Sequence, residues 1–163
     1  MRAYLGVGSN LGDRWANLAL GARRLRAASR VAVLRASRVW DAAPLGPPQP
    51  RYLNAVLELE TDLTATGLLA LCQKVEDAAG RKRGPVRWAA RTLDLDLLLY
   101  GDEVIRRPGL VVPHPHMVSR RFVLEPLADL APDLVVPCTG RTVVQILAAL
   151  PPEDLSPVGM YPG

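Results

Sequence analysis

The sequence has few of the residues that build disulfide frameworks, zinc sites or membrane anchors. Its two cysteines, Cys72 and Cys138, lie far apart in the chain, and we expect both to be buried, reduced thiols. No spacing of cysteine and histidine resembles a zinc site. No segment approaches the run of roughly 18 apolar residues that a membrane-spanning helix needs, and the N-terminus lacks the apolar region of a signal peptide. We therefore expect a cytoplasmic protein that does not bind membranes.

Lysine is also scarce: Lys74 and Lys82 are the only two, so arginine carries nearly all of the positive charge. The guanidinium group binds phosphate oxygens in pairs, which makes an arginine-rich chain suited to phosphate ligands. A net charge of +4 is too small to indicate a nucleic-acid partner by itself. The 163 residues, of which 49% are hydrophobic, are enough for one domain, residues 1–163, with a sizeable core.

Hydrophobic periodicity predicts four main strands and two helices. Apolar residues at helical spacing follow the first strand, and Thr64 and Gly80 are suited to begin and end the second helix. The expected strands are residues 2–8, 31–40, 52–61 and 92–100, with a proline-rich loop at residues 44–50. The order β-α-β-β-α-β predicts an α+β, ferredoxin-like fold, in which two helices pack on one face of an antiparallel sheet. We expect the third strand to be half exposed, because the other face of the sheet should be open or covered by long loops.

Turns and small C-terminal elements complete the expected chain. The glycine-rich residues 6–12 lack the spacing of a nucleotide-binding loop and are predicted to form a tight strand-to-helix turn. A short helix is predicted near residues 117–124, and Thr142 with Gln145 resembles a capping box that begins a last helix. The tail, residues 151–163, is expected to be loosely attached.

Two aspartates interrupt the apolar strand at residues 92–100. Asp94 and Asp96 are two residues apart, so on a strand they point to the same face with Cα atoms roughly 6–7 Å apart. Two carboxylates so placed can share magnesium ions, whose other ligands are usually water and substrate phosphates. The alternative is a solvated strand face, but like charges in a central strand repel each other without a cation. The leucines that alternate with the aspartates are expected to bury the opposite face: Leu93, Leu95, Leu97 and Leu99.

The segment before this strand is strongly basic. Residues 81–91 carry five positive charges in eleven residues and lead directly to the aspartate pair. A polyphosphate held by magnesium needs cations on its other side, which this segment could supply. Gly84 and Pro85 suggest a loop that moves as a unit over substrates. A solvated charged loop is one alternative; nucleic-acid binding with Trp88 as a stacking platform is another, although the acidic pair disfavours it.

Aromatic and amide side chains could bind a flat heterocycle. Tyr52 and Asn54 share one face of their strand, and Trp88 and Phe122 come from loops or helix ends. Aromatic rings can enclose a planar ligand while an amide binds its polar edge, although ordinary packing is the alternative for each residue. His114 lies between two prolines and could contact phosphate, act in acid–base chemistry or be structural.

Together these motifs resemble those of a known family. The residues that carry the resemblance are Gly8-Ser-Asn-Leu-Gly12, Pro44-Leu-Gly-Pro47, Tyr52-Leu-Asn54, Arg87-Trp88, Arg91-Thr-Leu-Asp-Leu-Asp96 and Val112-Pro-His114. They resemble the motifs of the 6-hydroxymethyl-7,8-dihydropterin pyrophosphokinases of folate biosynthesis. The resemblance runs in order along most of the chain.

The resemblance implies an enzyme that transfers the terminal pyrophosphate of ATP to the hydroxymethyl group of the pterin and releases AMP. It implies two magnesium ions on Asp94 and Asp96, and catalytic assistance from Arg81 and Arg91. The implied pterin contacts are Ala43, Leu45, Tyr52, Asn54, Trp88 and Phe122. The implied ATP contacts are Gln73, Glu76, Arg83, Arg91, Leu97, His114 and Arg120. ATP and the pterin are then the partners, without nucleic acid or membrane, and we expect a monomer.

The sequence departs from the family pattern at three places. Ala42-Ala43 stands where many members have Thr-Pro, so a contact there must come from the backbone. Pro115 replaces a common tyrosine, and Gly109 replaces a basic residue, which leaves Arg106 or Arg107 as candidates to compensate. The rival interpretation is a ferredoxin-like RNA-binding module without enzymatic activity. Such a module would present aromatic side chains on the sheet face, where this sequence has aspartates.

Overall fold

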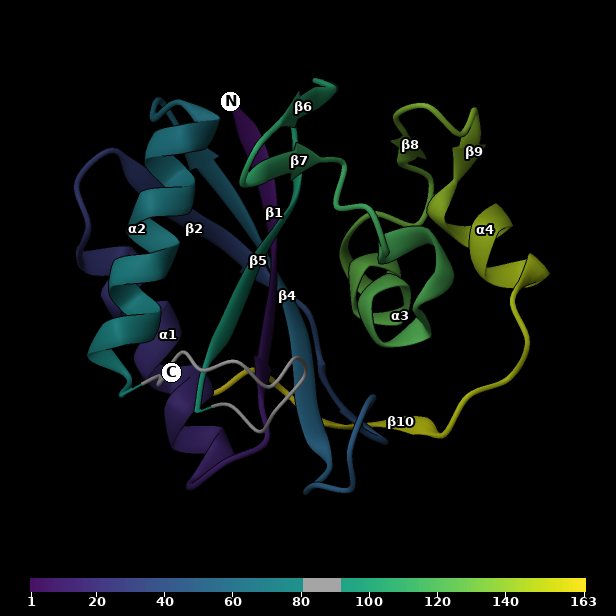
Figure 1. The fold of residues 1–163 in the computed structure, drawn as a ribbon, viewed down its shortest axis with the longest axis horizontal. Coiled ribbons are helices and arrows are strands. Elements are labelled where there is room, and N and C mark those ends of the chain that lie inside the picture. Colours follow the sequence, from purple (N-terminus) through teal and green to yellow (C-terminus); the bar gives the residue numbers. More distant parts are fainter. Residues whose placement is uncertain (81–91) are drawn as a thin grey trace.

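Helices cover both faces of a central β-sheet in the computed structural model, which describes residues 1–80 and 92–163 (Figure 1). The helices are α1 (Arg14–Ala27), α2 (Ala65–Ala78), α3 (Arg121–Leu130) and α4 (Val143–Ala149), with a 3₁₀ helix, η1 (Met117–Ser119). The strands are β1 (Arg2–Ser9), β2 (Val31–Ala36), β3 (Val39–Ala42), β4 (Tyr52–Thr61), β5 (Asp94–Tyr100), β6 (Ile105–Arg107), β7 (Leu110–Val112), β8 (Val135–Val136), β9 (Arg141–Thr142) and β10 (Leu155–Gly159). No helix within the described ranges is long and apolar enough to cross a membrane.

The main sheet confirms the predicted α+β fold with an antiparallel sheet. Its strand order is β10-β3-β4-β1-β5, and β2 also pairs with β4. Each of these pairs is antiparallel. The strand predicted at 31–40 divides into β2 and β3 because Ser37 lies between them and binds Val56 of β4. The Ser37 backbone N donates to the Val56 carbonyl (2.9 Å), and the Ser37 hydroxyl accepts from the Val56 N (2.8 Å).

The predicted helix ends are confirmed where the sequence supplies a cap. Thr64 accepts a hydrogen bond of 3.0 Å from the Gly67 N at the start of α2. Thr142 and Gln145 form the predicted capping box of α4. The helix expected near 117–124 is longer, since η1 is followed by α3, which continues past Pro126 to the end of its third turn. A proline inside a helical pattern usually marks an end, so it hid this continuation.

The second face of the sheet is covered by α3 and α4, not open or covered by loops as we expected. Val56, Leu98 and Leu99 pack there against Leu124 and Ile146 of the two helices. A separate core cluster lies under α1 and α2 on the first face. Most of β4 is therefore buried on both sides, and the expectation that it is half exposed is wrong.

Strand β5 changes the facing of its side chains partway along its length. Against β1 the register passes from Leu5–Leu97 to Tyr4–Leu99, which leaves Leu98 as the extra residue of a β-bulge. Leu97 packs under α1 and α2 as predicted, whereas Leu99 packs under α3 and α4. The expectation that Leu99 shares the face of Leu97 is wrong, because a bulge reverses the alternation of a strand.

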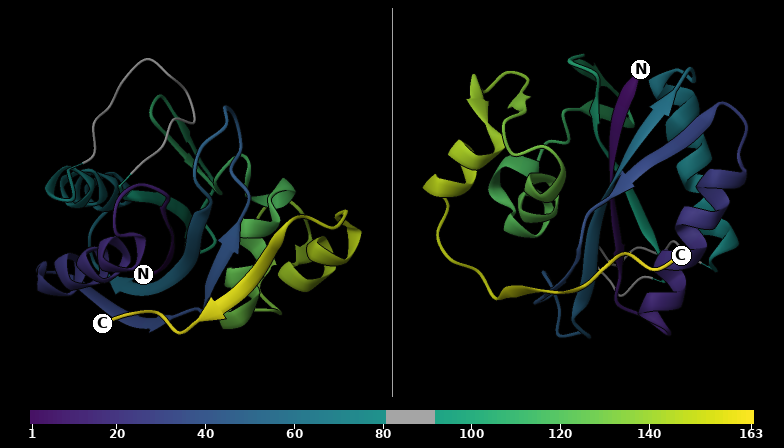
Figure 2. Two further views of the ribbon diagram at one scale, coloured as in Figure 1. Left: turned by 90° about the horizontal axis from the view of Figure 1, so that it is seen from below. Right: turned by 180° about the vertical axis from the view of Figure 1, so that it is seen from behind.

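The carboxyl-terminal tail is attached to the sheet, contrary to expectation. After α4 the chain passes along the edge of the sheet, pairs as β10 with β3, and ends beside α1 (Figure 2). There the Tyr161 hydroxyl donates a hydrogen bond of 2.6 Å to the Leu18 carbonyl. Strand pairing and this aromatic anchor fix a segment whose prolines suggested a loose end.

The two cysteines differ in their surroundings. Cys72 is buried, as expected, and burial raises the pKa of its thiol to about 12. Cys138 is exposed, so the expectation of a second buried thiol is wrong. It lies in the turn between β8 and β9, where its backbone has a positive φ of 72°.

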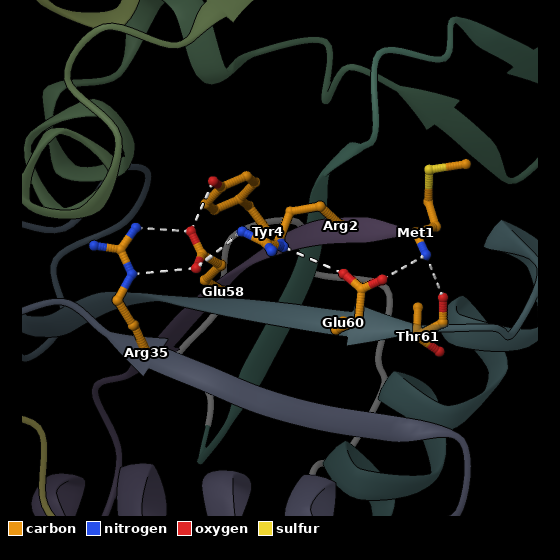
Figure 3. A network of polar contacts seen from close by, with 7 residues as sticks. All are labelled: Met1, Arg2, Tyr4, Arg35, Glu58, Glu60 and Thr61. Atoms are coloured by element: carbon orange, nitrogen blue, oxygen red, sulfur yellow. Dashed lines mark hydrogen bonds and ion pairs between the residues drawn. The ribbon is translucent and has the colours of Figure 1, made fainter.

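The buried carboxylate of Glu58, near the last residues of β4, is the centre of a polar network that connects three strands with the end of a helix (Figure 3). Glu58, 3% exposed, accepts a hydrogen bond from the Tyr4 hydroxyl (2.8 Å) and two from Arg35 (2.9 and 3.1 Å). Arg35 also donates to the Leu130 carbonyl (2.8 Å), and Arg2 lies 3.4 Å from the Glu58 carboxylate. The hydrogen bonds from Arg35 are the main cause that lowers the pKa of Glu58. The network joins β1, β2 and β4 to the end of α3.

Candidate functional site

A pocket opens on the α3 side of the sheet, where the end of β1 meets the starts of β4 and β5. It holds about 700 Å³ of space, part of it open to solvent. Strand residues form its floor, and residues around the start of α3 form one wall. The pocket brings together both predicted metal ligands, one predicted ATP contact and five of the six predicted pterin contacts. Its lining residues are Gly6, Val7, Gly8, Ala43, Leu45, Tyr52, Asn54, Ala55, Asp94, Asp96, Leu98, Arg120, Phe122 and Val123.

Two glycines form the centre of the floor, and sequence reasoning missed their role. Gly8 pairs with Asn54 on one side and with Asp94 on the other. A Cβ atom at Gly8 would lie 3.1 Å from the Asn54 Oδ1 and 3.4 Å from the Tyr52 ring. Glycine at alternate positions of a central strand signals a close approach of a ligand. That signal was present at Gly6 and Gly8, but the sequence reasoning assigned them to a strand end and a tight turn, without a role in ligand binding.

Asp94 and Asp96 lie beside these glycines on the same floor, half-buried and two residues apart. Their carboxylates are hard oxygen ligands, and Mg²⁺ usually binds one or two carboxylates and completes its shell with water and substrate phosphates. Within residues 1–80 and 92–163, no group of three or more His, Cys, Asp or Glu side chains could hold a metal ion. The donor set therefore fits magnesium that binds together with a phosphate ligand, rather than a zinc site made entirely of protein.

Glu76 supports the aspartate strand from α2. Its carboxylate, in a side chain that is 4% exposed, accepts a hydrogen bond of 2.8 Å from the Leu95 N, between the two aspartates. Because β5 is an edge strand, this N–H would otherwise need another partner. Glu76 lies outside the pocket lining, and its contact with ATP stays a prediction.

The opposite part of the pocket is suited to a flat ligand. Tyr52 and Phe122 supply aromatic rings from β4 and α3, and Asn54, 8% exposed, supplies an amide from β4. Ala43 and Leu45 contribute from the loop that follows β3. Rings that enclose a planar ligand, with one amide for its polar edge, are typical of a heterocycle site.

Arg120 supplies a cationic side chain at the α3 wall. The guanidinium carbon of Arg120 lies 5.6 Å from the centre of the Phe122 ring. His114 is outside the lining; its backbone N donates to the Leu98 carbonyl (2.9 Å), and its Nδ1 accepts from the His116 N (3.2 Å). Burial lowers the pKa of His114 to about 4, and Arg120 adds to this lowering. The ring is therefore neutral at pH 7 with its proton on Nε2, which can donate to a phosphate oxygen.

Two further predicted ATP contacts, both among the described residues, lie outside the pocket lining. Gln73 is exposed on α2, and Leu97 is buried under α1 and α2. The basic segment lies outside the described residues, and with it the predicted contacts Arg81, Arg83, Trp88 and Arg91.

Comparisons with known proteins show which family this chain resembles. The family model for 7,8-dihydro-6-hydroxymethylpterin-pyrophosphokinase (HPPK) matches residues 4–132. A 2-amino-4-hydroxy-6-hydroxymethyldihydropteridine pyrophosphokinase of Pseudomonas aeruginosa is 42% identical over 155 residues, 94% of this chain and 94% of its own length. The protein of the same name in Methylorubrum extorquens is 42% identical over 158 residues, 96% of this chain and 98% of its own length.

A solved structure described as HPPK-DHPS in complex with substrates has a similar fold. Its TM-score is 0.73 at 9% sequence identity, over 91% of this chain. This chain spans 43% of the length of that solved chain. At so low an identity the likeness concerns the fold alone.

Proposed function

The chain belongs to the 7,8-dihydro-6-hydroxymethylpterin-pyrophosphokinase family, and we propose that pyrophosphate passes from ATP to the pterin in the pocket on its sheet face. The chain is thus an ATP-using pyrophosphokinase of folate biosynthesis, which gives the pterin diphosphate and AMP. One observation carries the assignment to this pocket: the aspartate pair and the aromatic–amide group line the same cavity.

The aromatic end of the pocket holds the pterin. Tyr52 and Phe122 contact the faces of its ring, and the Asn54 amide binds its polar edge. Ala43 and Leu45 contact it through the loop after β3, with the backbone supplying the polar contacts. Rings and backbone together fix the direction of the hydroxymethyl group, which is most of what an in-line transfer needs.

The acidic end holds the triphosphate. Asp94 and Asp96 would hold two magnesium ions, which would neutralise charge on the triphosphate oxygens. The pterin hydroxyl oxygen bonds to the β-phosphorus as the bond from that phosphorus to the oxygen of AMP breaks, and the hydroxyl proton passes to water. Arg120 at the α3 wall and neutral His114 contact phosphate oxygens, and Glu76 keeps β5 in place.

The other predicted roles form part of the same proposal. Arg81 and Arg91 assist the transfer, and Gln73, Arg83 and Leu97 contact ATP. The acidic floor disfavours the rival RNA-binding module, because carboxylates repel a phosphate backbone without metal. The monomeric state and the cytoplasmic location stay predictions.

The test is AMP formation from Mg-ATP and 6-hydroxymethyl-7,8-dihydropterin by the wild-type chain and an Asp94→Asn, Asp96→Asn double variant. Loss of several kcal/mol of charge stabilisation should lower kcat by at least about a thousandfold. Asp102→Asn is the matched control, because Asp102 is exposed in the turn after β5. An AMP rate in the double variant close to that of the control would refute the assignment of the metal site.

A further inference from the structure

The loop between β3 and β4 carries part of the pocket wall. We call residues 43–51 the pocket loop; it contributes Ala43 and Leu45 to the lining, and Tyr52 follows it directly. Apart from its prolines, nothing in its own sequence fixes where it lies relative to the strands. Its position therefore depends on contacts with other parts of the chain.

One residue of the carboxyl-terminal segment contacts both ends of the pocket loop. At the first end, the Ala43 N donates a hydrogen bond of 3.0 Å to the backbone carbonyl of Asp154. At the last end, Arg51 donates to both carboxylate oxygens of Asp154, at 2.8 and 3.1 Å. The two ends are thus held together by a residue that immediately precedes β10 and lies outside the pocket lining.

A second acid and a second arginine complete this cluster. The Arg51 Nε also donates to the Asp41 carboxylate on β3. The Arg14 guanidinium, on α1, lies 3.6 Å from Asp41 and donates to the Arg51 carbonyl at 3.1 Å. Two cations thus alternate with two anions. The hydrogen bonds that Arg51 donates to Asp154 also lower the pKa of this carboxyl group.

A buried amide outside this cluster also holds the pocket loop, near its last residues. Asn10, which is 1% exposed, donates to the Gln49 side-chain oxygen (2.8 Å) and to the Pro50 carbonyl (3.0 Å). Gln49 in turn donates to the Leu45 carbonyl at 2.9 Å. The loop is therefore supported by the buried amide of Asn10 as well as by the exposed charges at its ends.

We propose that Arg51 and Asp154 are positioning residues for the pterin, which they hold indirectly by closing the ends of the pocket loop. This inference rests on the proposed function of the pocket. It gives the carboxyl-terminal segment a role in substrate binding although the segment does not line the pocket.

The expected effect is confined to the loop because both side chains are solvent-accessible. Arg51 is 41% exposed and Asp154 is 71% exposed. Ion pairs so exposed add little to global stability and are screened by salt, so their loss should loosen the loop and leave the fold intact. ATP binding at the acidic end should not change.

The variants are Asp154→Ala, Arg51→Gln, their combination, and Arg51→Lys as the conservative replacement. We expect pterin KM to rise about three- to fivefold in each of the first three, with ATP KM and kcat changed less than about twofold. The combined variant should be no worse than Arg51→Gln alone, because that substitution already removes the contact between Arg51 and Asp154. Arg51→Lys should raise pterin KM less than Arg51→Gln does.

The matched control is the Arg30–Asp62 pair, which is 2.8 Å apart, similarly exposed and beyond the other end of β4. Arg30→Gln and Asp62→Asn should leave pterin KM unchanged. At about 1 M salt, where the Debye length is about 3 Å, the ratio of variant to wild-type pterin KM should approach one.

The outcomes separate this inference from the proposed function. If Asp154→Ala and Arg51→Gln leave pterin KM at the wild-type value, or raise ATP KM equally, the positioning role is wrong. If the wild-type chain makes no AMP, the proposed reaction is wrong. Calorimetric titration with the pterin then tests the inference alone: equal affinities of wild-type and Asp154→Ala protein overturn it, and weaker binding by the variant supports it.

Discussion

Gly8→Ala should weaken pterin binding while leaving the fold intact. The added Cβ would lie 3.1 Å from the Asn54 Oδ1 and 3.4 Å from the Tyr52 ring. Contacts this close force the neighbours to move by a few tenths of an ångström. Asn54 is only 8% exposed, so it has little free space in which to move except toward the pocket. The amide that should bind the polar edge of the pterin is therefore displaced.

The size of the effect follows from one impaired hydrogen bond. A neutral hydrogen bond contributes about 0.5–1.5 kcal/mol net, which corresponds to about a two- to twelvefold increase in pterin KM. The same substitution restricts the unfolded chain, so stability should stay the same or rise by up to about 1 kcal/mol. Lost affinity without lost stability distinguishes a pocket effect from a folding defect.

The assay is steady-state AMP formation with each substrate varied in turn, together with thermal unfolding. Gly6→Ala is the comparison, because Gly6 lies on the same face of β1 but the three atoms nearest to its Cβ would all belong to the Leu98 side chain, at 3.5–3.7 Å. We expect a smaller change in pterin KM for that variant. An unchanged pterin KM in Gly8→Ala, or an equal change in both variants, would show that the reasoning from Asn54 is wrong.

His114 and Glu58 provide two further tests. The pKa of His114 is lowered to about 4 from its ordinary 6.5. Between these two pH values the unfolded chain therefore binds more protons at this residue than the folded chain does. The free energy of unfolding of the metal-free protein should consequently rise from pH 4 to 6.5. Urea unfolding at several pH values should show that His114→Gln loses this part of the pH dependence. If the unfolding free energy of His114→Gln rises with pH as steeply as that of the wild type, the lowered pKa is wrong. Glu58→Gln should reduce unfolding free energy by about 1–3 kcal/mol, because it removes a buried acceptor of charged hydrogen bonds. Both KM values should stay unchanged, since Glu58 lies toward the other end of β4; a changed pterin KM contradicts that separation.

The site residues that could be predicted from the sequence are pairs that lie two positions apart on one strand. The i, i+2 rule places Asp94 with Asp96, and Tyr52 with Asn54, on one face of a strand regardless of what the rest of the chain does. The order of strands and helices then brings β4 and β5 to either side of β1. The pocket lining agrees with that inference for these four residues.

The errors arose where long-range packing or a local irregularity decides the outcome. The bulge at Leu98 depends on pairing with β1, which no periodicity in β5 records. The attachment of residues 155–159 depends on the open edge of β3, and Tyr161 finds its partner 143 residues away. Such contacts are between segments distant in sequence, so local pattern gives no sign of them.

The same face of the sheet serves as core at one end and as pocket at the other, and side-chain size explains the change. Along β1, Tyr4 fills the space under α3 and α4, whereas the next two positions on that face are Gly6 and Gly8. Beside them Val56 packs in the core cluster, and its neighbour on the same face toward the pocket is Asn54. The floor therefore becomes small and polar where α3 begins, and the second helical layer both completes the core and forms a wall of the site. A helix that covered the whole face would have left no room for a substrate.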